Sequence, residues 1–363
     1  MNLLRPSRLA VAALTVSALA LTGCGASSTQ ASTQAGTPTP SGTPTPSGTA
    51  AADTAATLRL GYFANVTHAS AVYGIATGSF QQALGATTLK PSVFSAGPAA
   101  IEALRGGGLD AAFVGPNPAV NGFVQTKGKL LRIVAGTTSG GASLVVKSSI
   151  TSVDQLAGKK IATPQLGNTQ DVAAKSYFKA KGVAVTIVNQ DNAQTLDLFN
   201  SGQIDGGWVP EPWASRLVLD GGGTVLVDEA SLWPAGRFVT TQLVVRKEYL
   251  DRYPGTVTAL LKGLLAADAV VATKTAAVQK TVNDQLKVDT GKALRPEVLA
   301  AAFAHLTPTV DPIASSLATS AKHAQEIGLL KPVDLKGIYD LTILNQLLAA
   351  AGKPVVSDAG LGA

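Results

Sequence analysis

The sequence predicts an α/β protein whose folded part, about residues 57 to 353, is divided into two lobes. This length is large for a single hydrophobic core. Two stretches that lie 95 positions apart, Leu104–Val114 and Phe199–Val209, also align without gaps. Each contains the end of an amphipathic helix, a glycine that ends the helix, and an aspartate that leads into a short apolar strand. Any two α/β units share such features, and in that alternative the α/β prediction still holds.

Both of these strands run into proline-rich turns, Gly115–Pro118 after the first and Pro210–Pro212 after the second. Proline cannot donate a hydrogen bond to a neighbouring strand, so each strand is expected to end there. In open α/β sheets, ligands bind outside the carboxyl ends of the strands. We therefore expect both turns at a ligand-binding edge.

A second pair of similar runs, Leu144–Lys147 and Leu243–Arg246, predicts where the chain passes between the lobes. Short continuous apolar runs are typical of buried strands. We expect residues 57–144 to begin lobe 1, residues 145–238 to form lobe 2, residues 239–353 to return to lobe 1, and residues 354–363 to form a tail. The returning part is rich in helical spacing, at Val257–Val278, Arg295–Leu306 and Ile338–Ala351.

Residues 1–23 have the pattern of a secretory signal peptide. Arg5 and Arg8 precede an apolar stretch, Leu9–Leu21, whose 13 residues are fewer than a membrane-spanning helix needs. The chain's single cysteine, Cys24, follows small residues and resembles the lipobox cysteine of bacterial lipoproteins, which is acylated after the signal is cut off. We expect a lipid anchor on Cys24 at the extracytoplasmic face of the cell membrane, with more than one acyl chain for firm attachment. An ordinary secretory peptide that happens to contain a cysteine is the alternative.

Residues 24–56 are predicted to form a disordered tether that begins at the lipidated cysteine. Apart from Cys24, two glutamines and Asp53, the segment consists of Ser, Thr, Ala, Gly and Pro, and Thr37–Gly42 is repeated directly as Thr43–Gly48. Such a composition buries too little apolar surface to offset the entropy of ordering. No other apolar run reaches about 18 residues, so a folded body on a lipid tether is expected.

Composition and motifs argue against several functional classes. Two of the 29 Lys and Arg lie in the signal peptide, which leaves 27 against 23 acidic residues, and no basic cluster with interleaved aromatics predicts nucleic-acid binding. The histidines, His68, His305 and His323, lack the spacing of a zinc site. Neither a nucleophile elbow nor a phosphate-binding loop is present. We expect no catalytic residue, no metal and no cofactor.

Small polar residues gather at three predicted junctions between a strand and a helix, Gly61–Ala69, Phe94–Glu102 and Thr163–Asp171. The start of a helix presents unpaired N–H groups and a positive dipole end, so each junction can bind an anion. In the second, Ser95 is a candidate N-cap and Pro98 suits the first helical turn. The ligand-binding residues expected at strand ends and connections are Asn65, Thr67, His68, Ser95, Gly97, Gly115, Asn117, Ser139, Gly140, Gly167, Asn168, Thr169, Gln170, Trp208 and Glu211.

A sulfonate suits such an arrangement because it stays ionised and accepts several neutral hydrogen bonds. Structural roles are the alternative: Asn168 and Thr169 could cap a helix, His68 could be an ordinary core or surface residue, and Trp208 and Trp213 could be core aromatics. Three roles stay open for Glu211. It could recognise a cationic group, tune a hydrogen-bond donor, or pair across the lobes.

Several of these stretches together resemble a known family, the substrate-binding lipoproteins of bacterial ABC importers for aliphatic sulfonates, nitrate and taurine. They are Gly61–Ala69, Ser95–Leu104, Val114–Ala119, Thr163–Asp171, Trp208–Arg216 and Gly337–Leu341. The resemblance covers nearly all of residues 57–353. At Ala64 proline would be commoner in the family, and a slightly looser first loop is expected.

The resemblance implies a two-lobed fold of the periplasmic-binding-protein type II, with two crossover strands and a helical C-terminal part. It also implies a monomer that closes over a small oxyanion and docks on the membrane permease of an ABC importer. An aliphatic sulfonate is the expected ligand. Nitrate or bicarbonate would leave room beside Trp208, and taurine would need a carboxylate, for which Glu211 is the obvious candidate.

Two other functional classes compete with a receptor. Some relatives of the fold synthesise a thiamine pyrimidine precursor, but that chemistry goes with a cysteine-rich motif that this sequence lacks. An adhesive lipoprotein would not require polar residues at several strand ends.

Overall fold

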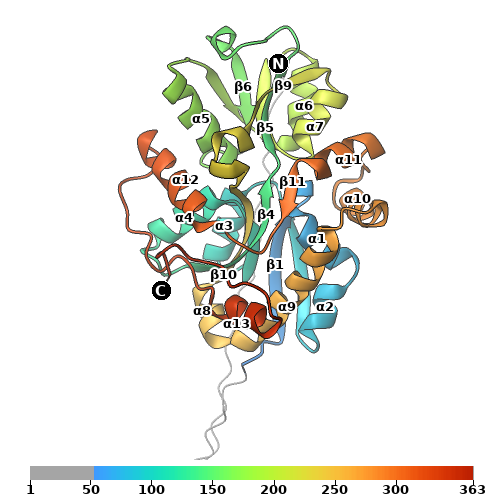
Figure 1. Cartoon of the computed structure of the whole chain (residues 1–363), viewed down its shortest axis with the longest axis vertical. Coiled ribbons are helices and arrows are strands. Elements are labelled where there is room, and N and C mark those ends of the chain that lie inside the picture. The colour runs from blue at the N-terminus through green and yellow to red at the C-terminus, as the bar shows by residue number, and fades with distance from the viewer. Residues whose placement is uncertain (1–52, 363) are drawn as a thin grey trace, which may run out of the picture. The chain divides into compact units, whose positions relative to one another are not determined.

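The structure is a computed structural model, and it describes residues 53–362. The expected signal peptide, the anchor at Cys24 and the tether up to residue 52 lie outside the described residues. Within residues 53–362, two β-sheets each carry their own helices, so the expectation of an α/β fold with two lobes is confirmed (Figure 1).

Lobe 1 is built on a six-stranded sheet with the order β11-β4-β10-β3-β1-β2. Strands β1 and β2 are parallel, β1 and β3 are parallel, and β10 runs antiparallel to both β3 and β4. The strands of this sheet are β1 (Thr57–Phe63), β2 (Thr88–Phe94), β3 (Ala111–Val114), β4 (Leu131–Gly140), β10 (Val239–Arg246) and β11 (Leu306–Pro308).

Lobe 2 is built on a five-stranded sheet with the order β7-β6-β8-β5-β9. Its strands are β5 (Ala142–Lys147), β6 (Lys160–Thr163), β7 (Thr186–Asn189), β8 (Gly206–Pro210) and β9 (Gly223–Asp228). Helices α5 (Thr169–Lys181), α6 (Asn192–Asn200) and α7 (Trp213–Leu219) cover it. Two apolar clusters form its core, one around Phe178 and Trp208 and one around Phe199 and Leu217.

The two stretches that align in the sequence occupy equivalent positions in the two sheets. The order β2-β1-β3-β10-β4 in lobe 1 corresponds to β7-β6-β8-β5-β9 in lobe 2, with the same parallel and antiparallel pairs. Asp110 accepts a hydrogen bond from the backbone N–H of Arg59 at 2.9 Å, and Asp205 accepts one from Lys160 at the same distance. Each aspartate therefore joins the start of one strand to its parallel neighbour.

The second pair of similar runs, Leu144–Lys147 and Leu243–Arg246, also occupies equivalent places in the two sheets. Val244 of β10 pairs with Ala112, and Val145 of β5 pairs with Gly207, where Ala112 and Gly207 are 95 positions apart. Each run lies within one sheet. The chain changes sheet just outside the runs, between β4 and β5 at Gly140 and Gly141, which have φ of 78° and 77°, and again between β9 and β10. Glycine suits these two positions because the backbone there is left-handed.

The helices of lobe 1 come from both parts of the chain. The first part supplies α1 (Ala69–Ala76), α2 (Ser79–Leu84), α3 (Gly97–Arg105) and α4 (Pro116–Gln125). The returning part supplies α8 (Lys247–Arg252), α9 (Pro254–Val271), α10 (Ala276–Thr290), α11 (Pro296–Ala304), α12 (Ala314–Glu326) and α13 (Thr342–Ala350).

Three expectations for the helical part need correction. The helix expected over Val257–Val278 is two helices, because the chain turns between α9 and α10 with Lys274 at a positive φ of 49°. The helix expected from Ile338 begins at Thr342, and Ile338 is buried before it. Helix α9 is itself 18 residues long and apolar enough to cross a membrane, contrary to the expectation that no further run has this length. Half of it is buried against neighbours such as α1 and α2, so it serves as a core helix.

Both ends of the described chain pack on lobe 1. Residues 53–56, expected in the tether, are held at the start of α9, where the N–H of Ala55 donates to Thr256 Oγ1 at 2.7 Å and the N–H of Gly255 donates to the Asp53 carbonyl at 2.9 Å. In the tail, the N–H of Val356 donates to Asn345 Oδ1 at 2.9 Å. The folded part therefore extends beyond both predicted limits.

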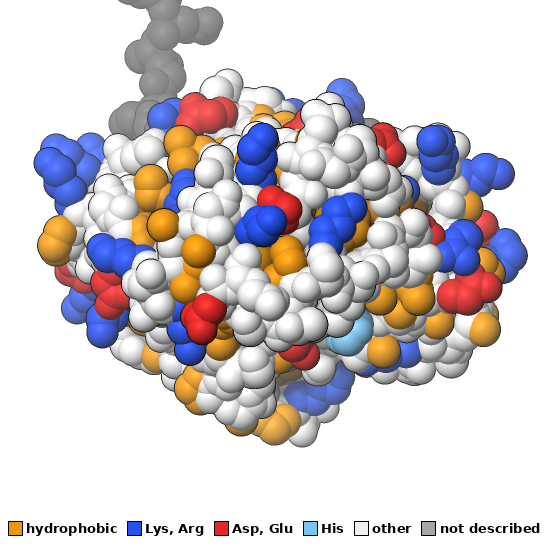
Figure 2. Space-filling view, turned by 90° about the horizontal axis from the view of Figure 1, so that it is seen from above, with side chains coloured by type: hydrophobic (Ala, Val, Ile, Leu, Met, Phe, Trp, Pro, Cys, Tyr) orange, Lys and Arg blue, Asp and Glu red, His pale blue; other side chains and the backbone are white. Residues whose placement is uncertain are grey.

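The surface of this part of the chain mixes charges of both signs. On the face seen from above in Figure 2, Lys and Arg side chains are scattered among acidic and apolar ones. This view shows no continuous basic patch.

Candidate functional site

The expected strand-end residues meet at a small polar cavity between the two lobes. Its volume is about 20 Å³, enough for a group of water size. The cavity lies at the carboxyl ends of β1, β2 and β3 in lobe 1 and of β6, β7 and β8 in lobe 2. Its lining residues are Phe63, Asn65, Thr67, His68, Ser95, Gly115, Asn168, Thr169, Gln170, Asn192, Pro210, Thr240 and Thr241.

Eight of the fifteen predicted ligand residues line this cavity. They are Asn65, Thr67, His68, Ser95, Gly115, Asn168, Thr169 and Gln170. The lining contains no Lys, Arg, Asp or Glu, so its polarity comes from hydroxyl, amide and imidazole groups and from backbone N–H groups. Such a lining can surround an anion with neutral donors.

Helix α5 begins directly at the cavity. Its first N–H groups lack carbonyl partners within the helix, and the N–H of Val172 is the first to bond back, to the Asn168 carbonyl at 3.1 Å. Asn168 is the N-cap by position, yet its side chain makes no capping hydrogen bond. The hydroxyl of Thr169 is buried and has no protein partner in the described part of the chain. The start of α5 therefore keeps its donors free.

The loop before α5 is fixed by the buried carboxylate of Asp171. This group accepts hydrogen bonds from Thr163 Oγ1 at 3.0 Å, the Gly167 N–H at 2.9 Å and Asn189 Nδ2 at 2.7 Å. Lys175 pairs with it at 2.8 Å. Donors held in place before a ligand arrives lose little entropy on binding.

His68 is a neutral donor at the cavity. The backbone N–H of Phe63 donates to its Nδ1 at 3.3 Å, which leaves the imidazole proton on Nε2. Burial lowers the pKa of His68 to about 3, and its ring lies 4.3 Å from the Phe63 ring between centroids. The side chain therefore offers an N–H without a positive charge.

The lobes touch each other around the cavity. The indole Nε1–H of Trp213, in lobe 2, donates to Asn65 Oδ1, in lobe 1, at 2.8 Å. The approach of Gly115 to Thr169 is so close that a Cβ on Gly115 would lie 2.1 Å from Thr169 Oγ1. The lobes are therefore closed upon each other in this structure.

Three predicted ligand residues with functional side chains lie elsewhere. Trp208 is fully buried in the core of lobe 2, where its indole N–H donates to Glu229 Oε2 at 2.7 Å. Asn117 donates to the Ser320 carbonyl at 3.1 Å and so faces α12. Glu211 accepts from the N–H and the hydroxyl of Ser215, both at 3.0 Å, at the start of α7.

The contact with Ser215 does not decide among the three roles left open for Glu211. Burial raises the pKa of the Glu211 carboxyl, and the hydrogen bonds from Ser215 lower it in part. Glu211 also contacts lobe 1 through its backbone, since its carbonyl accepts from the Thr67 N–H at 3.4 Å, and the charge of its carboxylate interacts with His305 of lobe 1.

The remaining predicted residues shape the surroundings of the cavity without lining it. Gly97 lies beside the cavity, where a Cβ would come 3.1 Å from Asn168 Oδ1. Ser139 and Gly140 lie where the chain leaves lobe 1, and Gly167 bonds to Asp171. Ser95, expected as an N-cap, makes no capping bond because α3 starts at Gly97 with Ala96 as its N-cap. Pro98 occupies the first turn as expected.

Asn192, Thr240 and Thr241 line the cavity and were missed from the sequence. Asn192 is the first residue of α6, directly after β7, and its Oδ1 is buried without a protein partner among residues 53–362. The same strand-to-helix pattern that marked the other junctions is present here. The two threonines gave no such signal, because they lie within β10.

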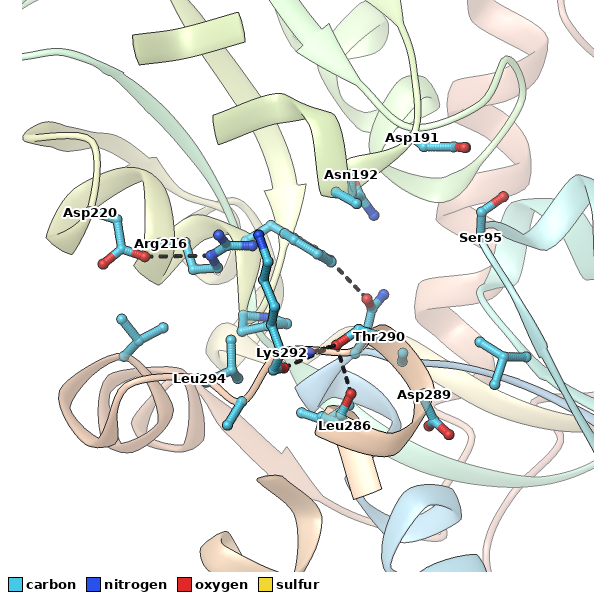
Figure 3. A pocket seen from close by; sticks show the side chains of 18 of the residues that line it. Ser95, Asp191, Asn192, Arg216, Asp220, Leu286, Asp289, Thr290, Lys292 and Leu294 are labelled. Carbon is cyan, nitrogen blue, oxygen red and sulfur yellow. Dashed lines mark hydrogen bonds and ion pairs between the residues drawn. The ribbon is translucent and has the colours of Figure 1, made fainter. Parts of the chain in front are cut away.

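A second, larger cavity of about 730 Å³ adjoins the small one. Both are lined by Asn65, Ser95 and Asn192. Figure 3 shows Arg216 and Lys292 reaching into the larger cavity, with Ser95, Asp191 and Asn192 along another wall. Some of the charged side chains in this cavity pair with one another. Asp220 Oδ1 accepts from Arg295 of lobe 1 at 2.6 Å, and Asp220 Oδ2 lies 3.4 Å from Arg216.

A polar cavity enclosed between two α/β lobes of equivalent strand order is the arrangement of the two-lobed periplasmic binding proteins. The NMT1-like family matches residues 51–283, and the chain belongs to this family. The resemblance noted in the sequence is thereby confirmed at the level of the family.

Individual relatives agree with this assignment. The chain is 28% identical over 176 residues to the taurine-binding periplasmic protein of Escherichia coli K12, a match that covers 48% of this chain and 54% of the relative. It is 28% identical over 102 residues to the bicarbonate-binding protein CmpA of a Synechococcus species, covering 27% and 22%. The matches thus span about half and about a fifth of these relatives.

Solved structures share the fold. The alkanesulfonate-binding protein SsuA of Xanthomonas axonopodis pv. citri, bound to MOPS, has a TM-score of 0.66 at 24% identity, over 77% of this chain and 96% of that one. The nitrate-binding protein NrtA of Synechocystis PCC 6803 has a TM-score of 0.71 at 15% identity, over 82% and 90%.

Proposed function

We propose that this chain is the extracytoplasmic solute-binding lipoprotein of an ABC importer and that it captures a small organic oxyanion, an aliphatic sulfonate. The observation that carries the proposal is the uncharged, donor-rich cavity between the lobes. The proposed ligand contacts are the N–H groups at the start of α5, His68 Nε2, and the side chains of Asn65, Ser95, Thr169 and Asn192.

The chemistry of the cavity favours a permanently ionised ligand over a weak acid. Neutral donors and a helix start stabilise a negative charge without a cation beside it. A sulfonate keeps its charge and offers three oxygens to donors that surround it. The buried hydroxyl of Thr169, which has no partner in the described part of the chain, gains one when the anion binds.

Ligand contacts from both lobes supply the driving force for closure. His68 and Asn65 belong to lobe 1, whereas Thr169 and Asn192 belong to lobe 2. An anion between them makes all of these contacts only when the lobes are together. It therefore shifts the population toward the closed form, which we propose to be the form that docks on the permease.

Nitrate or bicarbonate is the second candidate, and the small volume of the anion cavity favours it. Trp208 lies in the core of lobe 2, so these ions would leave no unfilled room beside it in the cavity. Taurine is not favoured over them, since the Glu211 carboxylate expected to hold its ammonium group bonds to Ser215. The sulfonate is preferred because the larger adjoining cavity offers room for an organic tail.

The proposal places the chain among transport receptors and not among enzymes, with a lipid anchor at Cys24, outside the described residues, and a monomeric state. Changing Cys24 to Ala should release the protein from membranes into the soluble fraction without lowering ligand affinity. Release together with loss of binding would contradict a separate anchor and receptor.

The ligand class is tested by titrating the full-length chain with alkanesulfonates, taurine, nitrate, bicarbonate and sulfate, using calorimetry and thermal unfolding. Sulfonates should bind and raise the unfolding temperature, because a ligand that binds only the folded state stabilises it. A response to nitrate or bicarbonate alone would show that one of these ions, and not a sulfonate, is the ligand. Turnover of any compound would show that the protein is an enzyme and not a receptor.

A matched pair of variants ties the binding to the cavity. Thr169→Val removes a buried hydroxyl and should weaken sulfonate binding about 10-fold or more, because hydrogen bonds to charged groups contribute about 1.5–3 kcal/mol. Thr224→Val on the exposed side of β9 is the control and should leave the affinity unchanged. Equal affinities for both variants would show that the ligand binds elsewhere.

A further inference from the structure

Trp213 stands between the small cavity and the larger one. Its ring lines the larger cavity, and its indole N–H bonds to Asn65, which lines both. It comes from lobe 2, directly after the turn that ends β8, whereas Asn65 comes from lobe 1. Any part that this contact plays in ligand binding rests on the proposed function.

The contact fixes the orientation of the Asn65 amide. An indole N–H can only donate, so the amide must turn its Oδ1 toward Trp213, as it does at 2.8 Å. The amide nitrogen then points away from the indole, and it makes no hydrogen bond to another described residue. Asn65 is buried at the edge of the anion cavity, so this nitrogen is available as a donor to the anion.

The indole ring forms part of the wall on the other side. The Arg216 guanidinium lies 5.2 Å from the ring centroid, and Arg216 is also paired with Asp220, which together hold the ring in place. Leu286 and Leu294 add apolar surface to the same cavity (Figure 3). A ligand headgroup of nitrate size leaves this larger cavity to water, whereas an organic tail can displace that water.

We propose that Trp213 makes the site select sulfonates that carry an organic tail. Its N–H orients the Asn65 amide as a donor to the sulfonate headgroup, and its ring covers the tail in the larger cavity. Trp213 is thus a positioning residue for the headgroup and a contact residue for the tail.

Two variants separate these actions. Trp213→Phe keeps an aromatic ring and removes the N–H, whereas Trp213→Ala removes both. Trp233→Phe is the matched control, because Trp233 lies outside both cavities and stacks on Phe238. The full-length chain and each variant are titrated by calorimetry with nitrate and with methane-, butane- and octanesulfonate, and the unfolding temperature without ligand is recorded.

For the unchanged chain, affinity should rise about 3- to 4-fold with each methylene that becomes buried, until the cavity is filled. Trp213→Phe should lower the affinity for every anion by one common factor of about 5- to 20-fold and keep the dependence of affinity on chain length. Trp213→Ala should also flatten that dependence. Trp233→Phe should match the unchanged chain. A purely structural role would lower the unfolding temperature without ligand and would not change the slope.

The outcomes separate the inference from the function on which it rests. If the unchanged chain binds no sulfonate, the proposed function fails and the inference with it. If it binds methane- and octanesulfonate equally, the function stands and the tail site is refuted. If Trp213→Phe binds like the unchanged chain, the positioning of Asn65 by Trp213 is refuted.

Discussion

Replacing Gly115 by alanine should hold the lobes apart while leaving each lobe intact. Gly115 has a φ of −77° and a ψ of 170°, which alanine adopts without strain. The added Cβ would lie 2.1 Å from Thr169 Oγ1, 3.2 Å from Thr169 Cβ and 3.3 Å from the Thr240 carbonyl oxygen. The severe contact is therefore with the opposite lobe.

The size of the effect follows from this overlap. An extra methyl group in a well-packed site costs about 1–3 kcal/mol, so sulfonate affinity should fall about 5- to 150-fold. Rotation of Thr169 away from the methyl group could relieve part of the overlap, but it would move the hydroxyl from its place at the cavity. Affinity falls by either route.

Calorimetric titration and thermal unfolding without ligand measure the two quantities separately. Gly106→Ala is the matched control, because a Cβ there would meet nothing closer than the Glu102 carbonyl oxygen at 3.4 Å. We expect Gly115→Ala to lose affinity and to keep the unfolding temperature of the control. Unchanged affinity, or a loss of stability without ligand equal to the loss of binding energy, would show that the close approach of Gly115 to Thr169 does not control lobe closure.

Three further predictions concern charge. Because burial lowers the pKa of His68 to about 3, His68 stays neutral, and sulfonate affinity should change by less than about twofold between about pH 5 and 8; marked tightening toward pH 5 in calorimetry would show that a cationic imidazole is used. Burial raises the pKa of Glu229 from 4.5 to about 7, so the folded state retains a proton that the unfolded state has lost, and stability should fall as the pH rises from about 4.5 to 7. Glu229→Gln should remove up to about 3 kcal/mol of this fall in denaturant unfolding, and parallel pH curves for both proteins would contradict it. The Arg295–Asp220 pair across the lobes is exposed, so Asp220→Asn should weaken binding only slightly and only at low ionic strength; a loss that persists in about 0.5 M salt would assign Asp220 a direct role.

The convergence of the strand ends could be predicted from the sequence because it follows from topology. Polar residues after β1, β2, β3 and β6 had to meet once the strands were recognised as parallel members of two sheets. The internal repeat gave the correspondence of the sheets, and Asp110 and Asp205 hold equivalent strand pairs as that repeat implied.

The direction in which single side chains point could not be predicted in the same way. Trp208 and Trp213 are five positions apart and both belong to apolar clusters of lobe 2, and only the packing shows that the indole of Trp208 bonds to Glu229 while that of Trp213 reaches Asn65. Trp208 lies within β8 and Trp213 begins α7, so no single period along the chain relates the directions of their side chains. Thr241 was missed because it lies inside the buried strand β10 and not at a junction between a strand and a helix.

The limits of the folded part were underestimated at both ends for a related reason. The segment at Asp53 has the composition of the tether, yet it is held by hydrogen bonds to Gly255 and Thr256. These partners lie about 200 positions further along the chain, so local composition carries no sign of them.

We propose that one anion is held between the lobes by neutral donors at the starts of several helices. A crystal structure of the full-length chain with butanesulfonate tests it most directly. We expect the sulfonate oxygens within hydrogen-bond distance of His68 Nε2 and the first N–H groups of α5, with the butyl chain against the Trp213 ring. A sulfonate bound outside the space between the lobes, or neutralised by a Lys or Arg side chain, would contradict it.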